Sequence, residues 1–340
     1  MPGLDVAVFG ATGAVGVEMV KILEERKFPV NSLRLLASRG GRSMEWRGRP
    51  TPVEAVGPSS FEGIHTALFA VEGDVSREWA PVAARGGAVV IDNSSAFRMD
   101  PEVPLVVPEV NPEDIAHHKG IIANPNCSTI IALVALAPLH RAAGLKRLVA
   151  STYQAVSGAG KAGLEELERQ VQAHARGTTA VASVFPYPIA FNLIPHIDAF
   201  DEDANTKEEL KMRDESRKIL RAPDLRVSCT CVRAPVLRSH SEALTIETER
   251  PLSPDEARKI LMNAPGVKLL DNPAERSYPM PLYASGQDLI HVGRVRRDDS
   301  VEEGRNGLVL WVSGDQLRKG AATNAVQIME KVSETLRETA

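Results

Sequence analysis

The chain has 340 residues, of which 43% are hydrophobic and 25% are charged, and its formal net charge is −4. This length predicts two domains, because single hydrophobic cores stop growing at roughly 250–300 residues. The charge lacks the basic excess of nucleic-acid-binding proteins, so we expect no nucleic-acid partner. Three cysteines without framework spacing and no apolar run of membrane-spanning length are typical of a cytoplasmic protein that does not enter a membrane.

Short apolar runs alternate with helical patterns in the first part of the chain. The runs lie at residues 6–9, 33–37, 66–71 and 88–91, and amphipathic helical patterns lie at 15–26 and 75–85. This β-α alternation predicts an α/β fold with a Rossmann-like, doubly wound parallel sheet. We place this first domain at residues 1–127.

The second part of the chain has longer strand patterns and fewer helices. Strands are predicted at 146–156, 225–233, 241–248, 289–297 and 307–313, and helices at 130–139, 161–175 and 207–220. Such a pattern favours an α+β domain with a mostly antiparallel sheet, which we place at 128–318. Apolar residues recur at helical spacing near the C-terminus, so we expect a helix within 319–340 that completes the first domain.

A glycine-rich turn follows the first strand and opens the first helix. Its residues are Gly10, Thr12, Gly13, Ala14, Val15 and Gly16. At this junction the glycines allow a tight turn, close approach of the backbone to a pyrophosphate, and packing of the helix on the sheet. The turn therefore predicts a dinucleotide site, with the phosphates at the helix N-terminus.

The end of the second predicted strand indicates which dinucleotide is bound. An NAD site usually has an acid there to bind the ribose 2′-hydroxyl, but the segment after Ala37 has no acid before Glu45. Ser38 and Arg39 suit a 2′-phosphate, so the sequence predicts NADP. Arg42 competes with Arg39 for this role, or belongs to a solvated loop.

Cys127 follows an Asn-Pro-Asn turn and begins a helical pattern. The positive end of a helix dipole favours a thiolate, which is the nucleophilic form of cysteine. A dinucleotide fold followed by such a thiol suggests aldehyde oxidation through a covalent thioester. Cys229 and Cys231 alternate on a predicted strand without histidines at ligand spacing, so we expect core packing there and no metal site.

Seven segments carry a resemblance to a known family. They are residues 10–16, 92–98, 124–129, 153–158, 192–198, 233–241 and 318–325. In this order they resemble aspartate-semialdehyde dehydrogenase of the bacterial type, over nearly the whole chain. The resemblance implies reductive dephosphorylation of 4-phospho-L-aspartate to L-aspartate 4-semialdehyde by NADPH, on the route to lysine by way of diaminopimelate, to threonine and to methionine. It also implies a homodimer or homotetramer.

The resemblance assigns roles to single residues. The catalytic set is the nucleophile Cys127, its orienting neighbour Gln154 and the acid/base His240. The residues expected to bind the substrate or its phosphate are Arg98, Asn126, Glu208, Lys211 and Arg233. Those expected near the nicotinamide are Ser157, Gly158 and Asn324. One departure is Gln316, where the family often has asparagine.

Several alternatives stay open on the sequence. His240 suits a proton carrier with a pKa near neutrality, but its place beside a strand also fits a surface histidine. Glu165, Glu166 and Glu168 fit a solvated helix face. A rival with the same chemistry is N-acetyl-glutamyl-phosphate reductase, which needs no group for a free α-amine. A rival from another class is a non-catalytic NADP-binding regulatory protein, which would tolerate loss of the thiol.

Overall fold

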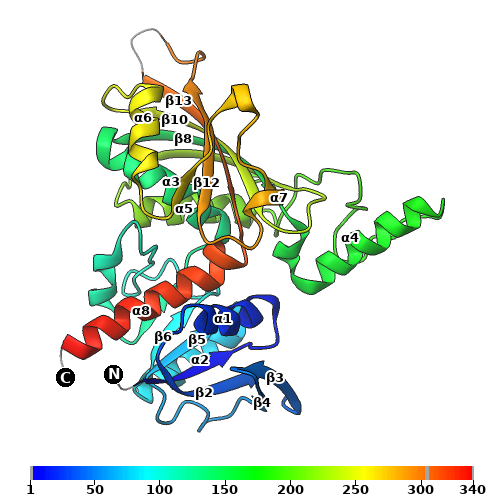
Figure 1. Cartoon of the computed structure of the whole chain (residues 1–340), viewed down its shortest axis with the longest axis vertical. Helices are drawn as coiled ribbons and strands as arrows, with labels where there is room; N and C mark the ends of the chain where they lie inside the picture. Colours follow the sequence, from blue (N-terminus) through cyan, green and yellow to red (C-terminus); the bar gives the residue numbers. More distant parts are fainter. Residues whose placement is uncertain (1–2, 303–305, 339–340) are drawn as a thin grey trace. The chain divides into compact units, whose positions relative to one another are not determined.

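The computed structural model describes residues 3–302 and 306–338, which divide into two compact units (Figure 1). The first unit contains residues 3–126 and 321–338. The second contains 127–302 and 306–320. Each unit has its own sheet.

The first unit is a seven-stranded sheet in the order β3-β4-β2-β1-β5-β6-β7, in which only the β3–β4 pair is antiparallel. Its strands are β1 (Leu4–Phe9), β2 (Val30–Ala37), β3 (Arg42–Trp46), β4 (Arg49–Ala55), β5 (Thr66–Phe69), β6 (Val89–Asp92) and β7 (Ile121–Ala123). Its helices are α1 (Ala14–Glu25), α2 (Gly73–Arg85), the 3-10 turn η1 (Pro112–His117) and α8 (Thr323–Glu338). The predicted doubly wound parallel sheet is confirmed.

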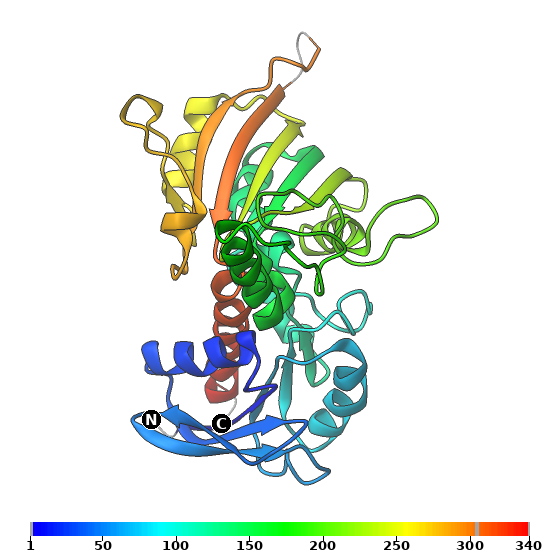
Figure 2. The same ribbon diagram turned by 90° about the vertical axis from the view of Figure 1, so that its right-hand side faces the viewer.

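The side chains of β1 alternate between two hydrophobic layers. Val6 and Val8 pack with α1 and α8, whereas Ala7 and Phe9 pack with α2 and Phe61 on the other face. Both figures show α1 and α8 on one face of this sheet (Figures 1 and 2). The C-terminal helix thus completes a layer of the first unit, and its regular α-helical part begins at Thr323, after a π-helical turn at Arg318–Ala322.

The hairpin β3–β4 was not predicted from the sequence. Prolines at positions 50 and 52 and several charged residues hide its strand pattern. β3 is the edge strand, and β4 pairs with β2 through residues 53–55, so both prolines precede the part of β4 that has a strand on each side. Arg42 is the first residue of β3, so the loop that follows β2 is shorter than expected and contains Ser38 and Arg39 but not Arg42.

The second unit is a six-stranded sheet in the order β11-β12-β13-β10-β8-β9, with three antiparallel pairs in its centre and parallel pairs at its two edges. Its strands are β8 (Leu145–Gln154), β9 (Arg226–Arg233), β10 (His240–Thr248), β11 (Val267–Leu269), β12 (Ile290–Arg297) and β13 (Asn306–Gly314). Its helices are α3 (Cys127–Ala143), α4 (Gly160–Ala175), α5 (Lys207–Ile219), α6 (Pro254–Met262) and α7 (Pro281–Ala284), with the 3-10 turns η2 (Val156–Ala159) and η3 (Pro273–Glu275). The mostly antiparallel sheet is confirmed; α6 and β11 were not predicted.

Helices α3, α5 and α6 cover one face of this sheet. Along β8, Leu148, Ala150 and Thr152 are buried on the covered face, while Val149 and Tyr153 alternate with them and are half-buried on the other. α3 is buried almost throughout because it lies between the sheet and the two other helices. Among helices within residues 3–302 and 306–338, none combines the length and apolarity needed to cross a bilayer.

Candidate active site

Three strands of the second unit's sheet and one helix begin or end close together. The side of the sheet where these strand ends lie is called the catalytic edge below, and it is distinct from the outer strands of the sheet. β8 ends at Gln154 and β9 ends at Arg233, and these two residues are paired in the parallel register. β10 runs antiparallel to β8, so its first residue, His240, lies at the same edge. Cys127, the first residue of α3, reaches this edge as well. The structure therefore brings together four of the predicted site residues that are far apart in the sequence.

Cys127 and His240 form a thiol–imidazole pair, with 3.4 Å between Sγ and Nε2. The other ring nitrogen, Nδ1, accepts a hydrogen bond from the Ala155 backbone N–H at 3.1 Å. A backbone N–H can only donate, so Nδ1 is unprotonated and the neutral ring carries its proton on Nε2. That proton points toward the sulfur, which also lies at the positive end of the 17-residue helix α3.

His240 is fully buried, so it is not a surface histidine. Burial lowers its pKa well below the ordinary value, and the charge of Arg233 lowers it further. The expectation of a pKa near neutrality is therefore wrong for the site as it stands, because a charged imidazolium here would lie out of water beside a guanidinium.

Gln154, the last residue of β8, is hydrogen-bonded to Glu208 on α5. Gln154 Nε2 donates to Glu208 Oε1 at 3.0 Å, and Gln154 Oε1 accepts from the Thr152 hydroxyl at 3.1 Å. The second oxygen of Glu208 accepts from Lys211 Nζ at 3.2 Å, and Lys211 also bonds to Asp198 at 2.8 Å. Glu208 is buried rather than part of a surface ion pair. Asp198 was not predicted as a site residue, although it ends one of the seven segments.

Arg233 is the second buried charge of the site. Its Nη1 donates to the Ala155 carbonyl at 2.7 Å, and its guanidinium carbon lies 5.7 Å from the centre of the Phe185 ring. Burial lowers the pKa of Arg233, while the opposite charge of Glu208 raises it. Gly158 lies against this group: a Cβ there would come within 2.7 Å of Arg233 Nη1 and 3.4 Å of the His240 ring.

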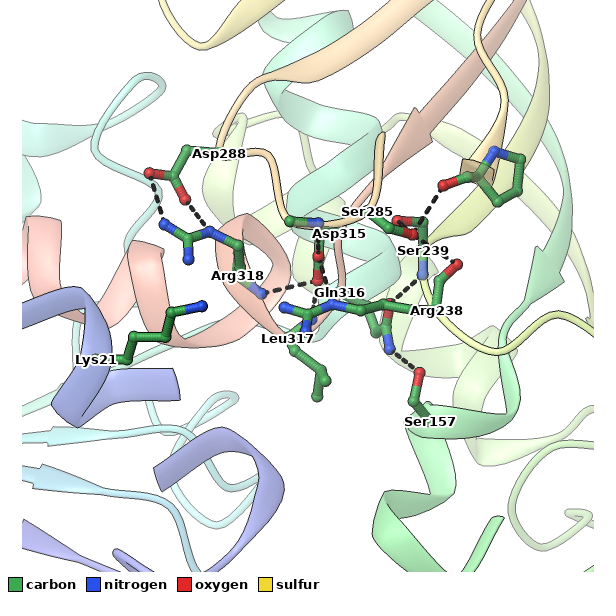
Figure 3. A network of polar contacts seen from close by, with 12 residues as sticks. Lys21, Ser157, Arg238, Ser239, Ser285, Asp288, Asp315, Gln316, Leu317 and Arg318 are labelled. Carbon is green, nitrogen blue, oxygen red and sulfur yellow. Dashed lines mark hydrogen bonds and ion pairs between the residues drawn. The ribbon is translucent and has the colours of Figure 1, made fainter. Parts of the chain in front are cut away.

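A second polar network joins the loop after β13 to the catalytic edge (Figure 3). Gln316 donates to the Ser157 hydroxyl and accepts from the Ser239 backbone N–H, so it holds the residue that precedes His240. Asp315 accepts from Arg238 at 2.6 Å. The family departure at Gln316 thus falls on a buried residue that holds two loops of the site. Gly320 was also missed; a Cβ there would come within 3.0 Å of Cys127 Cβ.

The glycine turn of the first unit has the shape that a dinucleotide phosphate needs. Gly10 has φ +84, and a Cβ at this position would lie 2.1 Å from the Ala70 carbonyl oxygen. A Cβ at Gly16 would lie 2.1 Å from the Gly10 carbonyl oxygen, so the helix and the turn are in backbone contact. Within the described chain, α1 begins without a side-chain cap or an acid in its first turn, which leaves its N-terminus suited to an anion.

Thr12 and Gly13 are exposed beside this turn, Ala14 and Val15 are half-buried in the first turn of α1, and Ser38 and Arg39 are exposed just after β2. Three further predicted residues are buried in the first unit. Arg98 donates to the Asn93 carbonyl at 2.8 Å, and Asn126 immediately precedes Cys127. Asn324 donates to the Val106 carbonyl and the Asn124 side chain at 2.9 and 2.7 Å.

Cys229 and Cys231 lie on β9 with 3.6 Å between their sulfur atoms. The hydrogen bond with the Cys229 thiol, together with burial, raises the pKa of Cys231 far above its ordinary range, which suits an inert core thiol. No cluster of metal-ligating side chains occurs in the part of the chain that the structure describes.

The class of protein follows from two matches to family models. Residues 5–118 match the semialdehyde dehydrogenase NAD binding domain, and residues 136–319 match the semialdehyde dehydrogenase dimerisation domain. The chain therefore belongs to the semialdehyde dehydrogenase family.

The relatives narrow this class. Aspartate-semialdehyde dehydrogenase from Aquifex aeolicus (strain VF5) is 54% identical over 334 residues, which cover 96% of this chain and 97% of that protein. The Bacillus subtilis (strain 168) enzyme of the same name is 48% identical, with 97% of each chain covered. A crystal structure of aspartate semialdehyde dehydrogenase II from Vibrio cholerae complexed with ASA has a TM-score of 0.95 and 46% identity, covering 98% of this chain and 99% of that one. The resemblance inferred from the seven segments is confirmed.

Proposed function

We propose that this protein is an NADP-dependent aspartate-semialdehyde dehydrogenase, which reductively dephosphorylates 4-phospho-L-aspartate to L-aspartate 4-semialdehyde. The observation that carries the proposal is the Cys127–His240 pair beside two buried side chains of opposite charge, Glu208 and Arg233. The substrate has an amine, a carboxylate and a reactive acyl group, and the site offers a partner for each. The near-full-length similarity to enzymes of this name supports the same assignment.

The first half of the reaction is acyl transfer to the thiol. The Cys127 thiolate attacks the acyl carbonyl carbon, the C–S bond forms, and the C–O bond to phosphate breaks. The start of α3 and the His240 Nε2–H stabilise the thiolate, and backbone N–H groups at the helix start suit the tetrahedral oxyanion. By resemblance, Arg98, Asn126 and Lys211 hold the phosphate.

The second half releases the aldehyde. NADPH, when bound at the glycine turn with Ser38 and Arg39 at its 2′-phosphate, supplies the hydride that reduces the Cys127 thioester. The resulting oxyanion expels the thiolate, whose negative charge again falls at the helix start beside the Nε2–H of His240. Pairing of the substrate carboxylate with Arg233 removes the lesser of the two causes, after burial, that lower the pKa of His240. His240 therefore stays neutral with Nδ1 on the Ala155 N–H, and its Nε2–H donates a hydrogen bond to the substrate oxygen, which is the position of the acid/base that the resemblance implies.

Glu208 favours the aspartyl substrate over the acetylglutamyl one. A buried carboxylate held by Gln154 at 3.0 Å is a partner for a cationic amine, and an acetylated nitrogen carries no charge. A non-catalytic protein would have no use for a thiol and imidazole aligned at this strand edge. We place the cofactor on the first unit and catalysis on the second.

Assembly and location belong to the same proposal. The match to a dimerisation domain and the half-buried Tyr153 and Trp311, whose rings lie 5.5 Å apart on the sheet face opposite α3, support a homodimer or a dimer of dimers through that face. Sedimentation of the purified protein distinguishes these two states. We propose that the enzyme acts in the cytoplasm, within lysine, threonine and methionine biosynthesis.

The testing experiment measures NADPH formation from NADP and L-aspartate 4-semialdehyde, with and without inorganic phosphate. Turnover that requires phosphate and is lost after alkylation of Cys127 is expected. A preference for N-acetyl-L-glutamate 5-semialdehyde would shift the assignment to the acetylglutamyl reaction. Cofactor binding without turnover of either aldehyde would favour the non-catalytic alternative.

A further inference from the structure

Glu166 on α4 is a buried carboxylate that lies outside the catalytic set. Its neighbours Glu165 and Glu168 are exposed, as expected, but Glu166 is fully buried, so the prediction of a solvated helix face is wrong at this position. The side chain faces an irregular segment, residues 181–194, that follows α4. Lys, Arg, Asp and Glu are almost never fully buried unless they are paired, so this carboxylate calls for a structural reason.

The reason is a set of hydrogen bonds to the 181–194 segment. Glu166 Oε2 accepts from the Ser183 backbone N–H at 2.9 Å, the Ser183 hydroxyl at 2.5 Å and the Val184 N–H at 2.6 Å, and Oε1 lies 3.4 Å from the Phe185 N–H. Burial alone would raise the pKa of Glu166, but these donors hold it below its ordinary value, so the group is an anion at neutral pH.

Gln170, one helical turn further along α4, fixes the other part of the segment. Its amide oxygen accepts from the Ile189 and Ala190 N–H groups at 2.7 and 2.9 Å, and its Nε2 donates to the Val181 carbonyl at 3.0 Å and to Glu166 at 3.2 Å. The segment has no regular secondary structure, so two side chains of α4 provide the partners that a strand would otherwise provide.

The segment meets the active site at Arg233. Ile194 forms an antiparallel bridge with Arg233, with backbone hydrogen bonds of 3.0 and 2.8 Å. The ring of Phe185 lies over the Arg233 guanidinium, and it also lies close to α4, since a Cβ at Gly163 would come within 3.2 Å of it. Glu166, through the backbone of residues 183–185, thus sets the position of the ring that faces Arg233.

We infer that Glu166 is a positioning residue for substrate binding: its carboxylate fixes the 183–185 backbone so that Phe185 holds the Arg233 guanidinium in place for the substrate carboxylate. This role rests on the proposed function of Arg233. Because Arg233 binds the substrate carboxylate equally in the ground state and the transition state, a change at Glu166 should alter KM rather than kcat.

The test compares Glu166→Gln with Glu165→Gln, the same change one residue earlier on the exposed face, where Glu165 pairs with Lys161. The amide of Gln at 166 presents an N–H₂ group to N–H donors, so it cannot replace the carboxylate. We expect Glu166→Gln to raise the KM for L-aspartate 4-semialdehyde roughly three- to thirtyfold, the usual range for a lost cation–π contact, and to leave kcat and the KM for NADP within about twofold. Glu165→Gln should match the wild type.

Phe185→Leu provides the second variant, because it removes the ring and keeps the Glu166 hydrogen bonds. It should raise the same KM, whereas amide hydrogen exchange at residues 183–185 should accelerate in Glu166→Gln alone. Two of these measurements do not depend on turnover. One is the amide exchange, and the other is the rate at which phenylglyoxal modifies Arg233. The phenylglyoxal rate should rise in both variants. Faster exchange with unchanged Arg233 reactivity and KM would overturn the inference, whereas a wild type that reacts with neither aldehyde would overturn only the proposed function.

Discussion

Adding one methyl group at Gly158 separates two roles for this residue. The family resemblance places Gly158 near the nicotinamide, but the structure places it against Arg233 and His240. A Cβ at this position would lie 2.7 Å from Arg233 Nη1, 3.4 Å from His240 Cε1 and 3.6 Å from His240 Nε2. The His240 ring is buried and fixed by the Ala155 N–H, whereas Nη1 is the end of a flexible side chain, so Arg233 is the group that moves.

The cost follows from the bond that Arg233 would lose. Its Nη1 donates to the Ala155 carbonyl at 2.7 Å, and a hydrogen bond from a charged donor contributes about 1.5–3 kcal/mol. If Gly158→Ala displaces the guanidinium, the carboxylate clamp loses that orientation. We expect the KM for L-aspartate 4-semialdehyde to rise roughly ten- to a hundredfold, with a smaller change in kcat.

The assay is steady-state NADPH formation with each substrate varied in turn. Gly57→Ala is the matched control, because a Cβ there meets no atom within 4 Å. A rise in the KM for NADP with an unchanged KM for the semialdehyde would refute the reasoning, since the methyl group would then act on the cofactor and not on Arg233.

Three further predictions concern the thiol, the clamp and a buried acid. Cys127→Ala should abolish turnover and leave NADP binding, measured by calorimetry, nearly intact; equal loss of both would contradict separate cofactor and thiol sites. Arg233→Lys should raise the semialdehyde KM about tenfold or more, because lysine cannot form the bidentate fork, and unchanged kinetics would count against the clamp. Burial, with the charge of Glu208, raises the pKa of Glu242 well above 4.5. The folded state therefore keeps a proton that the unfolded state releases, and stability falls as pH rises above about 4.5. Glu242→Gln should therefore gain stability over wild type between pH 4.5 and 7 in urea unfolding, by up to about 1.4 kcal/mol per pH unit, and a pH-independent difference would disprove this.

The sequence predicted the elements whose burial pattern is strong. The first strand alternates between two buried layers, and the last helix repeats Ala325, Ile328 and Met329 at helical spacing, so both have the periodicity that burial imposes. The β3–β4 hairpin escaped prediction because strand segments with a neighbour on one side accept proline and charge, which remove that periodicity.

At the candidate active site, the sequence indicated residues that the fold brings together, but not their environment. Cys127 and His240 lie 3.4 Å apart, but the burial that lowers the pKa of His240 depends on three strand ends that meet only in the fold. Glu166 was interpreted as exposed because its neighbours in the sequence are charged. Its partners Ser183 and Val184 lie 17 and 18 residues later in an irregular segment, and no local pattern indicates such contacts.

The central claim is that Cys127 carries the acyl group. We would mix the enzyme with L-aspartate 4-semialdehyde and NADP in the absence of phosphate, then measure the NADPH burst and the mass of the peptide that contains Cys127. The account predicts a burst of about one NADPH per active site and an aspartyl thioester on Cys127, which added phosphate removes. Absence of a burst, or a burst that leaves Cys127 unmodified, would contradict it.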